Sequence, residues 1–91
     1  MSLIMKFKSA GFTMDKYNEA IKQLNTAGAG SPKGRKHHVC SGSPDGVDIT
    51  DVWDSREDFE AFGKTLLPIL HSLDVDPGQP EVQQVHNIIV G

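Results

Sequence analysis

Hydrophobic residues alternate with polar ones from Leu3 to Lys8 and then recur every three or four positions after Thr13. The first spacing predicts a strand and the second predicts a helix. Thr13 is well placed as the N-cap of that helix, and Asp15 lies in the first turn, where the helix dipole favours negative charge. The apolar face of the helix is formed by Met14, Tyr17, Ile21 and Leu24. The chain therefore begins with a strand and an amphipathic helix.

The segment from Asn25 to Lys36 follows neither spacing, because it contains three glycines and Pro32. It also carries basic side chains, so phosphate binding has to be considered. A P-loop places lysine directly after its last glycine and then opens a helix. Here Gly34 is followed by Arg35, Lys36 and strand-like residues, which favours a mobile surface connection.

The stretch from His37 to Ser55 predicts a strand, a tight turn, a second strand and the start of a helix. Pro44-Asp45-Gly46 is strong turn chemistry, since glycine accepts the positive φ that a tight hairpin requires. Ser55 with Asp58 has the form of a capping box. The apolar residues that follow at helical spacing are Phe59, Phe62, Leu66 and Leu70. Pro68 lies within this helix, where we expect a kink or a restart near Leu67.

The end of the chain predicts a loop and one more strand. Asp74 to Pro80 is rich in proline and glycine, and Glu81 to Val90 alternates between two faces. The order strand, helix, strand, strand, helix, strand is that of a ferredoxin-like βαββαβ fold, with both helices on one face of a four-stranded antiparallel sheet. We therefore predict the α+β class and a single domain over residues 1–91.

The second face of this sheet also receives hydrophobic residues. We expect Val39 and Val52 to lie beneath the helices, whereas Val47, Ile49 and Trp53 point to the opposite face. A partly apolar sheet face that nothing covers is an interaction surface. Because sheet-to-sheet packing of two copies would cover it, we predict a homodimer with two-fold symmetry.

Composition narrows the classes of partner. The chain has 91 residues and a formal net charge of -3, without the concentrated basic face that nucleic-acid binding needs. Its apolar runs are far shorter than the ~20 residues that span a bilayer. The N-terminus lacks a secretory pattern, and one cysteine cannot form an internal disulfide. We expect a cytoplasmic protein with neither nucleic acid nor membrane as partner.

Four chemically distinctive side chains lie on the predicted hairpin, those of His38, Cys40, Asp51 and Trp53. If Asp45 and Gly46 are the central turn residues, His38 lies opposite Trp53 and Cys40 lies opposite Asp51. All four then share one face, which we expect to border a cavity. A turn of three residues would shift the register by one and break this grouping.

Asp51 suggests a catalytic pair, because a carboxylate in a middle strand with apolar neighbours needs a partner. His38 is the natural candidate, with Asp51 orienting the imidazole so that His38 acts as general base. Trp53 would form a flat apolar wall for an aromatic substrate. Cys40 would line the cavity. Nothing nearby in the sequence lowers the pKa of its thiol, so we do not expect it to act as a nucleophile. The alternative is that His38 is a surface residue and Trp53 is ordinary core.

The four histidines raise the possibility of a metal site. His37 and His38 are adjacent and point to opposite sides of a strand, and no second cluster has zinc-like spacing. We therefore predict no metal ligands. His86, on the predicted last strand, and His71, at the end of the second helix, could approach the cavity, although solvent exposure is the simpler expectation for His71.

Several segments together resemble a known family. They are the His38-Val39 strand, the Asp45-Gly46 turn, Asp51 to Ser55, Phe59, Phe62, Pro68, and Val85 to Asn87. In these the chain is similar to the dimeric α/β-barrel superfamily, in particular to small proteins like the antibiotic-biosynthesis monooxygenase domain. The resemblance covers nearly the whole chain and implies a homodimer with one cavity per subunit. Characterised members oxidise aromatic polyketides without metal or flavin, or bind and degrade haem.

The resemblance also bears on single residues. Trp53 matches the tryptophan at the end of the third strand, and His71 sits where haem-degrading relatives place a ligating histidine. Those relatives also use an asparagine on the first strand, where this chain has Lys6, Phe7 and Lys8. This difference argues against haem degradation.

These observations lead to one main hypothesis and two alternatives. The main hypothesis is a cofactor-independent, monooxygenase-like protein that binds or oxidises a small aromatic or polyketide-like molecule in a barrel cavity. His38 and Asp51 would be catalytic, and Trp53, His86 and Cys40 would contact the substrate. The first alternative is a dimeric binding or interaction module without catalysis. The second is a haem-binding protein that uses His71.

Overall fold

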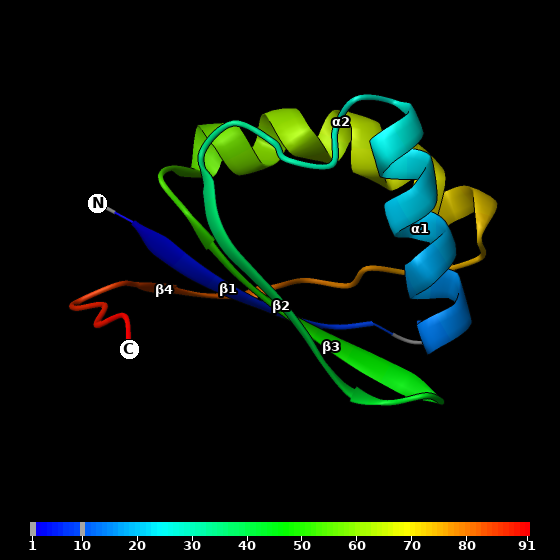
Figure 1. Cartoon of the computed structure of the whole chain (residues 1–91), viewed down its shortest axis with the longest axis horizontal. Coiled ribbons are helices and arrows are strands. Elements are labelled where there is room, and N and C mark those ends of the chain that lie inside the picture. The colour runs from blue at the N-terminus through cyan, green and yellow to red at the C-terminus, as the bar shows by residue number, and fades with distance from the viewer. Residues whose placement is uncertain (1, 10) are drawn as a thin grey trace.

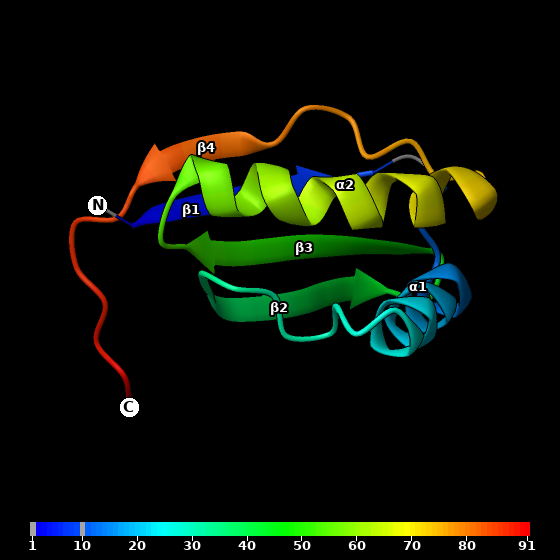
Figure 2. The ribbon, with the colours of Figure 1, turned by 90° about the horizontal axis from the view of Figure 1, so that it is seen from above.

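A computed structural model of the chain describes residues 2–9 and 11–91. Its elements are β1 (Leu3–Lys8), α1 (Met14–Thr26), β2 (Arg35–Ser43), β3 (Gly46–Trp53), α2 (Arg56–Ser72) and β4 (Glu81–Gln84). The strands form an antiparallel sheet in the order β2-β3-β1-β4. Both helices cover the same face of this sheet (Figure 1), and α2 runs along the strands (Figure 2). This is the ferredoxin-like α+β arrangement that the element order predicts.

Both helices begin at the predicted caps. The Thr13 side chain accepts a hydrogen bond from the Lys16 N–H at 3.3 Å, and the Ser55 side chain accepts one from the Asp58 N–H at 3.2 Å. The expected restart near Leu67 is not found, because α2 continues through Pro68 to Ser72. Apolar residues that pack onto the sheet on both sides of Pro68 offset the ~3 kcal/mol that an internal proline costs.

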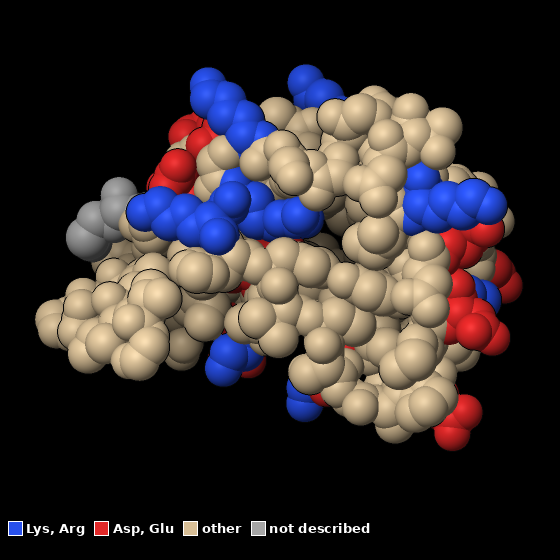
Figure 3. All heavy atoms as spheres, in the orientation of Figure 1, with Lys and Arg blue, Asp and Glu red and all other residues tan. Residues whose placement is uncertain are grey.

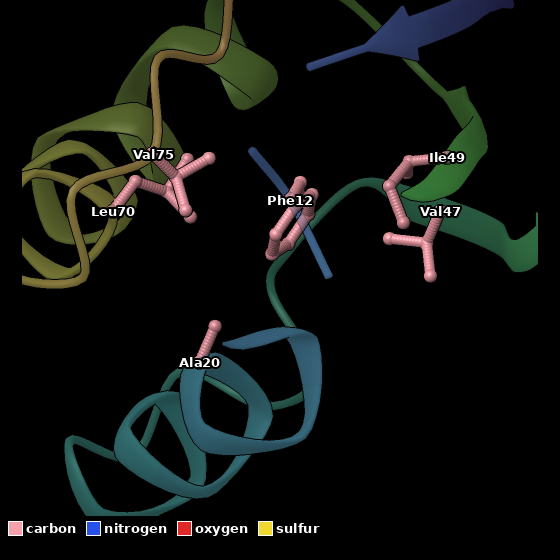
Figure 4. Close-up of a cluster of buried hydrophobic side chains, with 6 residues drawn as sticks. All are labelled: Phe12, Ala20, Val47, Ile49, Leu70 and Val75. Carbon is pink, nitrogen blue, oxygen red and sulfur yellow. The ribbon is translucent and has the colours of Figure 1, made fainter. Parts of the chain in front are cut away.

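The hydrophobic core lies between the helices and the sheet, in two clusters. One consists of Phe12, Ala20, Val47, Ile49, Leu70 and Val75. Phe12 lies at its centre, with Val47 and Ile49 on one side and Leu70 and Val75 on the other (Figure 4). The second cluster contains Met5, Leu24, Trp53 and Phe62. Trp53 and Met5 are its largest fully buried side chains, so this end of the core is organised around the tryptophan.

The hairpin register differs from the prediction by two residues. Ser43 pairs with Gly46, so Pro44 and Asp45 are the central turn residues, and His38 lies opposite Asp51 rather than Trp53. A shift by an even number of residues leaves every side chain on its own face. His38, Cys40, Asp51 and Trp53 therefore still share one face of the sheet.

That face is the one beneath the helices, and the predicted assignment of the two faces was wrong. Val47, Ile49 and Trp53 are buried in the helix-covered core, whereas Val39 is 53% exposed on the opposite face. Val52 also points to the opposite face, because it pairs with Ile4 of β1 and His37 of β2. Alternation shows which residues share a face, but the face that helices cover depends on packing outside the strands.

The last strand is shorter than predicted. It ends at Gln84, and residues 85–91 continue without regular secondary structure past the ends of the strands (Figures 1 and 2). Gln84 pairs with Leu3, the first residue of β1, so the chain beyond Gln84 has no β1 residue left to pair with. Ile89 and Val90 are consequently 81% and 83% exposed. In the described part of the chain, neither helix has the length and apolarity needed to cross a membrane.

Candidate functional site

A cavity of about 320 Å³ lies between the helices and the sheet. Its apolar walls include Ala20 and Leu24 of α1, Phe59 and Phe62 of α2, and Phe7 and Ile49 of the sheet. The polar or charged residues that line it include Tyr17, Arg35, His38 and Asp51, together with Ser9 and Glu60. A mainly apolar cavity with a few convergent polar groups is the usual form of a small-molecule site.

Tyr17, His38 and Asp51 form a continuous chain of hydrogen bonds. The Tyr17 hydroxyl lies 2.7 Å from His38 Nε2, and His38 Nδ1 lies 2.6 Å from Asp51 Oδ1. An ionised carboxylate can only accept, so Nδ1 donates to Asp51. In the neutral imidazole Nε2 then accepts the hydrogen bond that Tyr17 donates. The chain runs from the cavity wall to a carboxylate that is 5% exposed.

Local structure places these three side chains together. His38 and Asp51 are directly paired residues of β2 and β3, so their side chains emerge side by side from the same face. Tyr17 lies in the first turns of α1, where its N–H donates to the Thr13 carbonyl at 2.9 Å. Its ring stacks on the imidazole, with an interplanar angle of 6° and centroids 5.9 Å apart. The helix cap and the hairpin register thus jointly determine the geometry.

The electrostatic environment keeps Tyr17 and Cys40 protonated. Burial is the main cause that raises the pKa of the Tyr17 phenol, and the positive charge of Arg35 acts in the opposite direction. Burial likewise raises the pKa of the Cys40 thiol. At neutral pH Tyr17 is therefore a hydrogen-bond donor to His38, and Cys40 is a poor nucleophile.

Trp53 supports the cavity wall from behind. Its indole is fully buried and does not line the cavity. It packs edge-on against Phe59, with ring centroids 5.6 Å apart, and at a tilt against Phe62, with centroids 5.4 Å apart. Both phenylalanines line the cavity. Among the described residues the indole Nε1 has no hydrogen-bond partner. The structure thus places Trp53 one layer behind the position expected for a substrate-contacting wall.

The remaining predicted residues lie away from the cavity surface. Cys40 is half-buried beside Tyr17 but does not line the cavity. His86 is exposed in the segment after β4, and His71 is exposed at the end of α2 beside a separate depression. Within residues 2–9 and 11–91 no group of three or more His, Cys, Asp or Glu side chains could hold a metal ion.

Two residues of the site were not predicted from the sequence. Tyr17 was assigned to the core face of its helix, although a buried tyrosine hydroxyl usually needs a partner, and this requirement could have identified it. Arg35 was assigned to a mobile loop, but it is the first residue of β2 and lines the cavity. The local sequence pattern does not predict that Arg35 lines the cavity, because this position depends on an irregularity in the pairing of β2 with β3.

The fold and the cavity together define a class, namely a ferredoxin-like α+β protein with a candidate small-molecule site beneath its helices. No protein-family model matches the chain, and neither does any curated protein sequence. Solved structures, in contrast, match it over nearly its whole length.

One such structure, from Chloroflexus aurantiacus J-10-fl, is of a protein provisionally described as an antibiotic biosynthesis monooxygenase. It is 22% identical, with 99% of this chain and 97% of that chain covered and a TM-score of 0.57. A protein of the same description from Deinococcus radiodurans is 15% identical, with 99% and 97% covered and a TM-score of 0.61. SnoaB, a cofactor-independent oxygenase from Streptomyces nogalater, is 12% identical, with 97% and 94% covered and a TM-score of 0.62. The predicted resemblance to monooxygenase-like proteins is confirmed at the level of the fold.

Proposed function

We propose that this protein binds a small aromatic or polyketide-like molecule in the cavity beneath its helices and oxidises it with molecular oxygen. The observation that carries the proposal is the Tyr17–His38–Asp51 chain at the wall of a largely apolar cavity. Fold-level likeness supports the type of reaction, since SnoaB is a cofactor-independent oxygenase.

Tyr17 is the member of the chain that would meet the substrate. Both ring nitrogens of His38 are engaged, so His38 acts as general base through the phenol. The Tyr17 oxygen takes the substrate proton while the Tyr17 proton moves to His38 Nε2. Simultaneous transfer avoids a free tyrosinate, which is costly because burial raises the pKa of Tyr17. Asp51 pairs with the imidazolium that forms.

The oxidation balances with oxygen as the only co-reactant. An activated methylene between aromatic rings loses a proton, and the carbanion reduces oxygen by one electron. The two radicals combine into a peroxide on carbon, which is protonated by the relay. Loss of the second C–H proton with cleavage of the O–O bond yields a ketone and water. One oxygen atom enters the product, the other leaves as water, and the substrate supplies all the electrons.

The experiment that tests this function follows oxygen uptake with an anthrone as substrate. We expect oxygen consumption and quinone formation in equal amounts, faster than the spontaneous reaction, with the rate falling to background in His38→Ala. Calorimetry with the quinone product measures binding in parallel. Binding without oxygen uptake above background would contradict catalysis and support the non-catalytic binding module. Failure of both measurements would remove the proposed function altogether.

We further infer that two copies associate through the sheet face opposite the helices. Val39 is 53% exposed on that face, and Ile89 and Val90 are exposed in the segment after β4. Burying such apolar surface would favour association. Haem binding through His71 is not proposed, because His71 lies outside the main cavity.

The expected result for the dimer is a solution mass twice that of the chain, measured by sedimentation equilibrium. Val39→Glu should shift the population toward the monomer, because it replaces an exposed apolar side chain of that face by a charge. Met14→Glu is the matched control, since Met14 is similarly exposed but lies on α1. A monomeric wild-type chain, or equal dissociation in both variants, would contradict this interface.

A further inference from the structure

A β-bulge at the start of β2 turns Arg35 toward the cavity. Arg35 pairs with Trp53 and His37 pairs with Val52, so Lys36 is the extra residue between them. Strict alternation back from His38 would instead place Lys36 on the cavity face and Arg35 on the open face. Bulges recur beside functional sites because they redirect one side chain. Here the redirected side chain is a guanidinium.

Contacts of the residues next to Arg35 hold the backbone in the bulged conformation. Gly34 has a φ of 86°, and a Cβ at this position would overlap the carboxylate of Asp58. The Gly34 carbonyl accepts the Asp54 N–H at 2.7 Å. Lys36 points away from the cavity, where its Nζ lies 3.2 Å from Asp54 Oδ1. The bulge is therefore anchored on both sides of Arg35.

Arg35 has an unpaired charge and free donors among the described residues. One Nη2 hydrogen bond goes to the Gly30 carbonyl at 3.0 Å, and the guanidinium lies 5.7 Å from the centroid of the Phe62 ring. Guanidinium carries five N–H donors and no acceptor. Among residues 2–9 and 11–91, Lys36 pairs with Asp54 and His38 contacts Asp51, and no carboxylate pairs with Arg35.

The carboxylates that line the cavity form no ion pair with Arg35 in the described part of the chain. Asp51 is hydrogen-bonded to His38, and Glu60 is exposed to water. Lys and Arg side chains border a hollow between the helical layer and the sheet in Figure 3. The charge of Arg35 also acts to lower the pKa of Tyr17, so its field reaches the phenol that ends the hydrogen-bond chain.

We propose that Arg35 selects ligands in which a carboxylate is attached to a flat apolar body. The guanidinium fork matches a carboxylate with paired N–H donors, while the aromatic and aliphatic walls take the ring. This inference rests on the proposed function in using the same cavity. It narrows the ligand class from aromatic molecules to aromatic carboxylates, with the carboxylate at Arg35 and the reacting carbon toward Tyr17.

The test compares two ligands of nearly equal shape, a naphthoate and the corresponding naphthamide, by calorimetry at neutral pH. We expect wild type to bind the naphthoate at least about tenfold more tightly, as a charge-assisted bidentate pair would provide. Arg35→Gln should bring the two affinities within about threefold of each other. Lys33→Gln, which removes an exposed cation two residues before Arg35 that does not line the cavity, should keep the wild-type preference.

Arg35→Lys provides a second variant, which retains the positive charge and loses the paired N–H donors of the guanidinium. We expect it to keep a preference for naphthoate that is several-fold smaller than in wild type. Circular dichroism checks that each variant is folded. Equal affinities in wild type would overturn selection by charge and leave the proposed function standing. An unchanged preference in folded Arg35→Gln would overturn the assignment to Arg35, and a lack of binding by either ligand would overturn the use of this cavity.

Discussion

Tyr17→Phe is expected to lower the rate of substrate oxidation about 10²- to 10⁴-fold, the usual contribution of a positioned acid or base. The substitution removes only the hydroxyl that donates to His38 Nε2 at 2.7 Å. The aromatic ring keeps its stacking on the imidazole, and losing one half-buried hydrogen bond costs about 0.5–1.5 kcal/mol of stability. Steady-state oxygen uptake should therefore show a reduced kcat with a nearly unchanged KM.

Two further variants make this result specific to a proton relay. Because Tyr17 and His38 act as one unit, the double variant Tyr17→Phe/His38→Ala should be hardly slower than either single variant. Met14→Ala is the control, since Met14 lies on α1 like Tyr17 but is exposed and outside the cavity. Its rate should equal that of wild type. A normal rate in Tyr17→Phe with a slow His38→Ala would show that His38 reaches the substrate directly.

Trp53→Ala is expected to destabilise the fold by about 3–5 kcal/mol, the range for removing a fully buried tryptophan. The indole is fully buried between the sheet and α2, so its removal leaves a void that rigid neighbours cannot fill. Small domains have only about 5–15 kcal/mol of stability. Urea denaturation followed by circular dichroism should therefore show a large fall in the midpoint.

Trp53→Phe distinguishes the effect of lost side-chain volume from the effect of the indole N–H at the same position. It keeps an aromatic ring against Phe59 and Phe62 and removes an indole N–H that lacks a partner among the described residues. We expect it to cost less than half as much as Trp53→Ala, because removing an unsatisfied donor returns part of the lost stability. Met14→Ala, at an exposed position, should stay within about 0.5 kcal/mol of wild type. A Trp53→Ala midpoint equal to that of wild type would contradict the structural role of the indole.

The candidate site could be predicted only in part, and the reason differs from residue to residue. His38 and Asp51 were found because a buried carboxylate in a middle strand requires a partner. Trp53 was found as an unusual residue, but its place behind the cavity wall depends on how α2 packs. Tyr17 looked like one more apolar position of a helix, since a helical period says nothing about what faces the hydroxyl.

The sequence by itself determined the order of the elements, both helix caps and the grouping of His38, Cys40, Asp51 and Trp53 on one face. These features are local, because they follow from periodicity, capping side chains and the parity of strand pairing. Only the tertiary structure decided which face the helices cover, where β4 ends and that Arg35 enters the cavity. Each of these depends on contacts between distant segments: α1 and α2 pack onto the face that bears Trp53, β1 limits the length of β4, and β3 imposes the bulge before His37.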